Sequence, residues 1–174
     1  ADVRYGLATK VDFSQQPYKV WIDEEKLIEA DSVIICTGAS AKWLGIPSEE
    51  RLNGFGVSAC AVCDGFFFRG KEVAIVGAGY TAAEEAMYLS KLCTTVHMFI
   101  RRYKMRASKI MQDRVVNTPN IKVYWNTDTD EILGGKKVEA VRIKNNQTKQ
   151  TQEIPISGFF VAIGHQPNSD IFKG

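Results

Sequence analysis

The chain has 174 residues, of which 45% are apolar and 24% are charged, and its formal net charge is +2. This composition excludes a disordered chain, and the near balance of charges gives no overall field that would favour nucleic acid or an anionic membrane. No apolar run approaches the ~20 residues that cross a bilayer, and the first residues lack the basic flank and apolar stretch of a signal peptide. We therefore expect a soluble, cytoplasmic protein with neither a membrane nor a nucleic-acid partner.

The first part of the chain is predicted to be rich in strands. Residues 7–28 alternate apolar and polar side chains around the turn-like SQQP, which predicts a small antiparallel meander. The apolar run ADSVIICTG, residues 30–38, predicts a fully buried strand that ends at Gly38. Residues 40–56 then mix proline, glycine and charge, as connections between units do, so a domain boundary is expected near residue 44.

Strands and helices alternate in the middle of the chain. The periodicity predicts strands at 72–77, 96–100 and 121–125, with helices at 81–93 and 107–117 between them. This βαβαβ order implies a parallel sheet and an α/β fold. A hairpin is expected over 138–156, followed by a buried strand over 158–164.

Four cysteines are present, but only Cys60 and Cys63 have a chelating or redox spacing. A four-cysteine zinc site usually needs a second close pair, so no metal is expected. Cys36 ends an apolar run, and Cys93 shares an apolar helix face with Ala82, which predicts that both are buried and inert. Without a secretory signal, the CxxC pair is more consistent with a redox-active pair than with a structural bridge.

The turn GAGYTA, residues 77–82, fits the GxGxxG/A dinucleotide fingerprint. It follows a predicted strand and opens a predicted helix, whose first N–H groups can hold phosphates. A glycine turn in an α/β protein that binds no nucleotide remains the alternative. The cofactor-binding residues expected from this Rossmann-like turn are Gly77, Gly79, Tyr80, Thr81 and Ala82.

The next strand is followed by arginines where an NAD site usually has an acidic residue. No Asp or Glu lies between Glu85 and Asp113, whereas Arg101, Arg102 and Arg106 follow the strand directly. A guanidinium binds a 2′-phosphate through two parallel hydrogen bonds, so the pattern selects NADP over NAD. A solvated basic helix start or a nucleic-acid patch would be the alternatives, but the segment offers only one aromatic side chain to interleave with the charges.

A thiol pair beside a nicotinamide site needs a mediator between hydride and thiol chemistry, and flavin usually has that role. The segments ICTGASAKWLGIPSEE, GVSACAVCDGFFFRGKEVAIVGAG, TAAEEAMYLS and VAIGHQPNSDIFKG, with the RR pair, closely resemble the low-molecular-weight thioredoxin reductases. The resemblance covers nearly the whole chain. It implies NADPH and FAD as cofactors, thioredoxin as the partner, and a homodimer in the complete enzyme.

The resemblance also implies roles for individual residues. Cys63 would exchange electrons with the flavin, Cys60 would attack the thioredoxin disulfide, and Asp64 would protonate the departing thiolate. An acid of this kind needs a raised pKa in a partly desolvated site, which a flavin ring and the following FFF run would provide. A turn aspartate before Gly65 is the alternative. Thr37 and Gly38 are implied on the flavin side, and Ile100 stands where members commonly have His.

Reductases of this family carry two flavin motifs, yet the only GxGxxG/A match here is at residue 77. We therefore expect a fragment with a partial FAD-binding domain at 1–43, an NADPH-binding domain at 44–154 and a second partial FAD-binding piece at 155–174. Such a chain would bind NADP(H) and hold FAD weakly or not at all. A related flavin disulfide reductase that feeds a peroxiredoxin, and a non-catalytic NADP-binding redox switch, remain alternatives.

Overall fold

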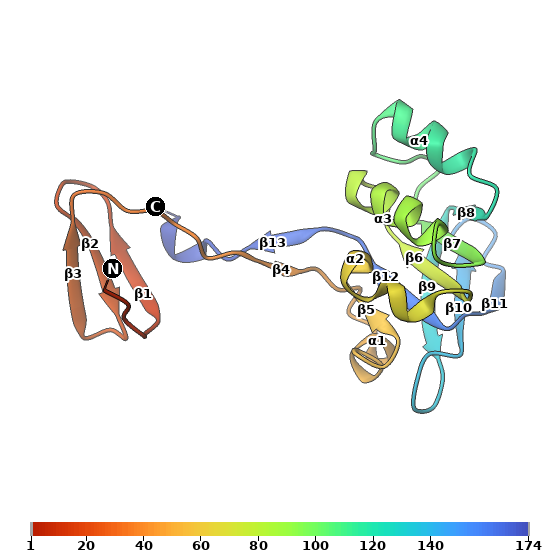
Figure 1. The fold of residues 1–174 in the computed structure, drawn as a ribbon, viewed down its shortest axis with the longest axis horizontal. Helices are drawn as coiled ribbons and strands as arrows, with labels where there is room; N and C mark the ends of the chain where they lie inside the picture. The colour runs from red at the N-terminus through yellow and green to blue at the C-terminus, as the bar shows by residue number, and fades with distance from the viewer. Residues whose placement is uncertain (1, 174) are drawn as a thin grey trace. The chain divides into compact units, whose positions relative to one another are not determined.

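The computed structural model describes residues 2–173, which form two compact units (Figure 1). The first takes in the described residues up to Ser40 together with those from His165 onward, and the second is Ala41–Gly164.

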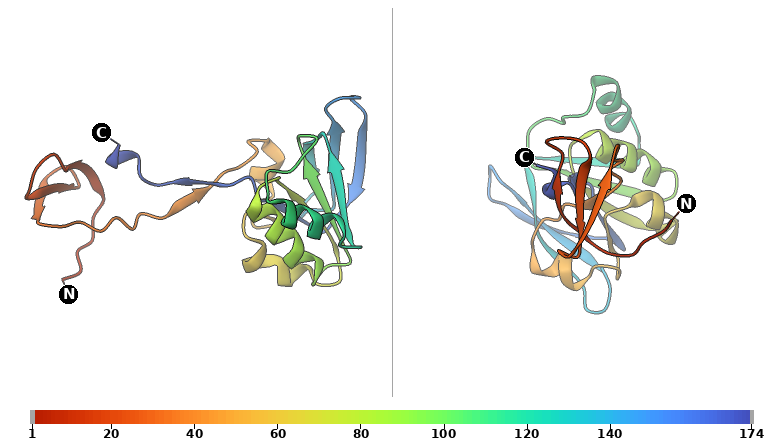
Figure 2. Two further views of the ribbon diagram at one scale, coloured as in Figure 1. Left: turned by 90° about the horizontal axis from the view of Figure 1, so that it is seen from above. Right: turned by 90° about the vertical axis from the view of Figure 1, so that its left-hand side faces the viewer.

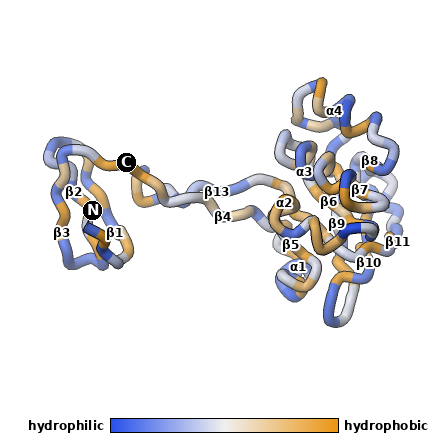
Figure 3. Tube along the Cα trace, in the orientation of Figure 1, coloured by the Kyte–Doolittle hydropathy of each residue, from blue (hydrophilic) through white to orange (hydrophobic). Residues whose placement is uncertain are grey.

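The first unit contains the antiparallel meander that the sequence predicts. Strands β1 (Ala8–Asp12), β2 (Tyr18–Ile22) and β3 (Lys26–Ala30) pair in that order. Their hydropathy is mixed along each strand, as expected for a sheet with one face in solvent (Figure 3). The short helix η2 (Asp170–Phe172) adds Phe172, whose ring stacks on Phe13 with centroids 6.2 Å apart.

The prediction of a buried strand at residues 30–38 is wrong. No strand forms between Ala30 and β4 (Ala39–Ala41), and Ile34 is 90% exposed. An apolar run becomes a buried strand only where a sheet is present to pair with it, and no described strand pairs with this segment. β4 itself forms a two-stranded ladder with β13 (His165–Pro167).

A five-stranded parallel sheet forms the centre of the second unit and confirms the predicted α/β, Rossmann-like class. Every neighbouring pair in the sheet runs parallel. In spatial order its strands are β5 (Val57–Ser58), β12 (Gly158–Val161), β6 (Glu72–Val76), β7 (Thr95–Ile100) and β8 (Ile121–Trp125).

Helices cover one face of this sheet. α3 (Tyr80–Ser90) and α4 (Lys109–Val116) lie side by side on it (Figure 2), and α4 begins at Ser108, whose hydroxyl accepts the N–H of Met111. The predicted apolar face of α3 is confirmed, because its alanines and Leu89 are fully buried against alternate residues of the strands. Three shorter helices precede α3: α1 (Pro47–Arg51), α2 (Ala61–Asp64) and η1 (Gly65–Phe68).

A second, antiparallel sheet packs on the other face through a separate apolar cluster. The predicted hairpin is confirmed as β10 (Ala140–Asn145) and β11 (Thr151–Pro155). A third strand, β9 (Thr127–Leu133), pairs with β10 and was not predicted. The strand expected at 158–164 is β12, and it lies between β5 and β6 in the parallel sheet, so the second compact unit extends beyond residue 154 as far as Gly164.

Candidate functional site

The carboxyl ends of the parallel strands bring the main site residues to one edge of the sheet. Cys60 follows β5, Gly77 follows β6, Arg101 follows β7 and Ala162 follows β12. Because these strands all run in the same direction, their carboxyl ends lie at the same edge. Open parallel sheets bind their ligands at that edge.

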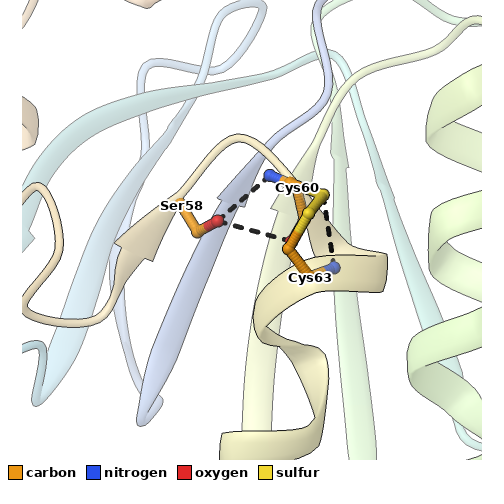
Figure 4. Close-up of a disulfide and its surroundings, with 3 residues drawn as sticks. All are labelled: Ser58, Cys60 and Cys63. Carbon is orange, nitrogen blue, oxygen red and sulfur yellow. Dashed lines mark hydrogen bonds between the residues drawn. A yellow bond between two sulfur atoms is a disulfide. The ribbon is translucent and has the colours of Figure 1, made fainter.

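The two cysteines of the CxxC motif form a disulfide in the short helix α2. The N–H of Cys63 donates to Cys60 Sγ at 3.2 Å, so the first sulfur caps the helix. The N–H of Cys60 donates to the hydroxyl of Ser58 at 3.0 Å (Figure 4). Ser58 is itself buried. Its bond fixes the start of the segment that carries Cys60 and Cys63, the redox loop, to β5.

The disulfide lies at the surface with apolar side chains around it. Cys63 is exposed and Cys60 is half-buried. The side chains of Val62, Phe66 and Phe67 are 65%, 63% and 71% exposed. A cluster of apolar groups in solvent beside a reactive group is typical of a surface that meets another protein.

The aromatic run after Asp64 does not form the shield that the sequence suggested. Phe66 and Phe67 lie in solvent, and only Phe68 turns inward, where its ring packs edge-on against Phe160 with centroids 5.5 Å apart. Asp64 is half-buried at the end of α2. Any further desolvation of this carboxyl must come from a group outside the described residues.

The other two cysteines differ from one another. Cys93 is buried, as predicted, and burial raises the pKa of its thiol to about 11. Cys36 was predicted to be buried and is exposed, because the segment that carries it has no sheet to join. Neither forms a disulfide.

Glu85 of α3 is a half-buried acid that sequence reasoning missed. Its Oε2 atom is buried without a hydrogen-bond partner. Burial raises the pKa of this carboxyl, and a backbone hydrogen bond from Ala61, the residue after Cys60, opposes that shift. The helix behind the redox loop therefore holds an acid that is costly to ionise.

The glycine turn has the shape that a bound pyrophosphate needs. Gly77 has φ of +150°, and a Cβ atom there would lie 2.3 Å from the carbonyl oxygen of Ala162, so only glycine fits. A Cβ atom on Gly79 would meet nothing within 4 Å, which leaves open space next to the backbone. Ala82 packs under the turn and is fully buried, while Tyr80 and Thr81 are exposed at the start of α3. No side chain caps this helix, so its first N–H groups are available to a ligand.

The three predicted arginines line one pocket together with the glycine turn. The pocket has a volume of ≈ 480 Å³, and its lining includes Gly77, Arg101, Arg102 and Arg106. The N–H of Arg106 donates to the carbonyl oxygen of Ala78 at 2.6 Å. The glycine turn and the arginine segment are thus held together by the backbone, and the guanidinium groups in the pocket are donors of the kind that bind phosphate.

Several polar lining residues come from β9, which the sequence analysis did not identify as a strand. Thr127, Asp128 and Thr129 all line the pocket. No motif marks them, because their place beside the arginines follows from the β8–β9 turn and not from local spacing.

The predicted flavin-side residues Thr37 and Gly38 lie in the first unit. Asn168 binds both of them: its N–H donates to the carbonyl oxygen of Gly38 at 3.0 Å and its side-chain amide to that of Thr37 at 3.2 Å. Asn168 belongs to the HQPN segment, which the motif analysis singled out without giving it a role.

Among residues 2–173, no helix is both long and apolar enough to cross a membrane. Nor does the described part of the chain gather three or more His, Cys, Asp or Glu side chains that could hold a metal ion.

Comparison with known proteins agrees with the motifs. The model of the pyridine nucleotide-disulphide oxidoreductase family matches residues 2–174. The chain is 48% identical over 168 residues to the thioredoxin reductase of Rickettsia prowazekii, a match that covers 95% of this chain and 54% of the relative. It is 47% identical over 177 residues to that of Vibrio cholerae, covering 99% and 55%. The chain thus spans about half the length of the curated relatives it matches.

Solved structures give the same result. The chain resembles thioredoxin reductase from Giardia duodenalis with a TM-score of 0.89 and 39% identity, over 97% of this chain and 55% of that one. For the crystal structure of the Lactococcus lactis enzyme the TM-score is 0.86 and the identity 36%, over 98% and 56%. These findings confirm the resemblance inferred from the motifs, and the chain belongs to the pyridine nucleotide-disulphide oxidoreductase family.

Proposed function

We propose that this chain is the NADPH-binding and disulfide-bearing portion of a thioredoxin reductase. In the complete enzyme, electrons would pass from NADPH through FAD to the Cys60–Cys63 disulfide and on to thioredoxin. One observation carries the proposal: a surface disulfide and an arginine-lined pocket beside a glycine turn lie at the same edge of one parallel sheet. The names of the relatives support the choice of thioredoxin as the partner.

The nucleotide would be held by the second unit of the chain. The open side of Gly79 lets a pyrophosphate approach the backbone, and the free N–H groups at the start of α3 donate to it. Arg101, Arg102 and Arg106 bind the 2′-phosphate by charge-assisted hydrogen bonds. A bound nicotinamide and a flavin would supply hydride chemistry and its link to thiols.

The disulfide would act by thiol exchange. Reduction breaks the Cys60–Cys63 bond with two electrons and two protons and leaves a dithiol. One thiolate then attacks a sulfur of the partner's disulfide, which forms a mixed disulfide and releases one partner thiolate. Attack by the second cysteine re-forms the Cys60–Cys63 bond and releases the partner as a dithiol.

The two cysteines differ in how easily an external disulfide reaches them. The family resemblance gives the attack on thioredoxin to Cys60. The exposure of the two residues favours the other order, however. Cys63 is exposed and Cys60 is half-buried, so a partner would reach Cys63 first. Asp64 follows Cys63 directly and would return a proton to the departing thiolate. The exposed Val62, Phe66 and Phe67 would contact the partner around the disulfide.

The remaining features of the complete enzyme are also part of this proposal. The first unit would belong to a FAD-binding domain, with Thr37 and Gly38, tied together by Asn168, on the flavin side. The second unit, Ala41–Gly164, would be the NADPH-binding domain. The complete enzyme would be a cytoplasmic homodimer, as the family resemblance implies.

The experiment uses the chain without added flavin. The chain is reduced with a phosphine, freed of reductant and mixed with oxidised thioredoxin, and the thiols gained by thioredoxin are counted by mass spectrometry. In a Cys36→Ser background, which removes the other exposed thiol, we expect two thiols per chain, and none from the Cys60→Ser/Cys63→Ser variant. The proposal would be overturned if the chain is folded and its two thiols react with a small aromatic disulfide, but no thiols are transferred to thioredoxin. Calorimetric titration with NADPH tests the pocket separately.

A further inference from the structure

The nucleotide pocket contains an acidic side chain that the arginine pattern does not explain. Its lining includes the cationic residues Arg101, Arg102, Lys104 and Arg106, and one carboxylate, that of Asp128. A site that serves only to attract a 2′-phosphate gains nothing from a carboxylate in its wall, because like charges repel at short range.

The backbone holds Asp128 near the arginine segment. The β8–β9 turn passes through Asn126, which has φ of 52°, and the N–H of Asn126 donates to the carbonyl oxygen of Arg102 at 3.2 Å. Asn146 binds both the turn and the arginine segment. Its side-chain amide donates to the carbonyl oxygen of Arg101 at 2.8 Å, and its N–H donates to the carbonyl oxygen of Asn126 at 2.7 Å. Asp128 is therefore fixed by the fold and is not a side chain of a free loop.

The carboxylate of Asp128 is not engaged with the cations around it. Within residues 2–173 it takes part in no ion pair and no side-chain hydrogen bond, whereas the next acids along β9, Asp130 and Glu131, both pair with Arg142. Asp128 is half-buried and lines the pocket, so its carboxylate is available to a ligand there.

We propose that Asp128 is a specificity-determining residue that lowers the preference of the pocket for 2′-phosphorylated nucleotides. It opposes the phosphate charge that the arginines attract, and it accepts a hydrogen bond from the ribose hydroxyl of a dinucleotide without that phosphate. The pocket then takes NADH as well as NADPH. This inference rests on the proposed function, because it requires that the pocket bind a nicotinamide dinucleotide.

The test compares two acids on one strand. NADPH and NADH are titrated calorimetrically into the unaltered chain, Asp128→Asn and Asp130→Asn. The second variant removes the same charge from the same strand outside the pocket, where Arg142 keeps its pairs with Glu131 and Glu153, and so reports the effect of net charge. We expect the ratio of the NADH to the NADPH dissociation constant to rise on the order of tenfold in Asp128→Asn, through tighter NADPH and weaker NADH binding, and to stay unchanged in Asp130→Asn.

Three results would overturn the inference. An equal change of the ratio of dissociation constants in Asp128→Asn and Asp130→Asn would mean that only net charge matters. Weaker binding of both nucleotides in Asp128→Asn would mean that Asp128 contacts a part that they share, such as the adenine. Weaker binding of NADPH alone would mean that Asp128 orients an arginine. If the unaltered chain, folded by its melting curve, binds neither nucleotide, it is the proposed nucleotide site that fails.

Discussion

The backbone N–H of Arg106 donates a 2.6 Å hydrogen bond to the carbonyl oxygen of Ala78. Ala78 is the middle residue of the glycine turn, so the bond couples the arginine segment to the turn whatever side chain residue 106 carries. The guanidinium groups can thus be removed one at a time without loss of the geometry that holds them.

Replacement of any of the three arginines should weaken NADPH binding specifically. We expect Arg106→Ala to raise the dissociation constant for NADPH about tenfold while that for NADH changes little, because a charge-assisted pair to phosphate is lost. Calorimetric titration of both nucleotides measures this. Arg114→Ala removes an exposed arginine from α4 and serves as the control; an equal loss there would point to net charge as the cause.

The two glycines of the turn should respond differently to alanine. In Gly77→Ala the new methyl group meets the carbonyl of Ala162 at positive φ, so the free energy of unfolding should fall by about 2 kcal/mol or more. In Gly79→Ala the methyl group meets no protein atom, so the cost should be about 1 kcal/mol or less, from a poorer N-cap. NADPH binding should nevertheless be lost in Gly79→Ala. Denaturation measures the two stabilities and calorimetric titration measures the binding. Unchanged NADPH binding by Gly79→Ala would mean that the pyrophosphate does not bind at this turn.

Exposure predicts which cysteine reacts first. In a Cys36→Ser background, Cys60→Ser leaves the exposed Cys63 and should react with an aromatic disulfide several-fold faster than Cys63→Ser, which leaves the half-buried Cys60. Release of the coloured thiolate gives both rates. Faster reaction of Cys60 would instead support the order implied by the family resemblance.

Asp64→Asn should slow the exchange step and leave nucleotide binding intact. The amide cannot return a proton to the departing thiolate, so transfer of thiols from the reduced chain to thioredoxin should slow about tenfold or more. The control is Asp113→Asn, which removes an exposed carboxylate from α4. An unchanged rate in Asp64→Asn would exclude the role.

The half-buried Glu85 should make the free energy of unfolding depend on pH. Burial raises its pKa in the folded state, so its stabilising contribution is present below pH 4.5, the value for a free carboxyl, and is lost as the pH rises through the folded pKa. Glu85→Gln removes this loss, and its melting temperature should exceed that of the unaltered chain at pH 7 but not at pH 4. The exposed Glu84→Gln is the matched control. A difference independent of pH would mean that packing and not ionisation is responsible.

The sequence predicts those parts of the fold whose signal is local. Strands β6, β7 and β8 are rich in apolar residues, and the glycine turn and the arginines have fixed spacing, so each is found from its own residues. The segment around Ile34 has an equally apolar run but is not a strand. Hydropathy indicates that a residue avoids water, but it does not show whether a neighbouring strand is present to pair with it.

The residues that were missed depend on contacts distant in the sequence. Strand β9 reads TDTDEIL, and only Thr127 and Ile132 in it are buried, so its apolar signal is weak. Asp128 lines the same pocket as the arginines although it is far from them in the sequence. No spacing rule relates these residues to the motifs that they serve.

The place of β12 has a consequence for the order in which the unit can form during synthesis. The last-made strand of the parallel sheet separates β5 from β6, so neither can gain that neighbour until the chain is complete as far as Val161. Until then the strand that carries the redox loop has no sheet to join, and the nucleotide pocket lacks the wall supplied by Ile163. A nascent chain that stops short of this strand would leave its two paired cysteines outside the sheet and its arginine-lined pocket incomplete, and both would reach their final places only after β12 has been made.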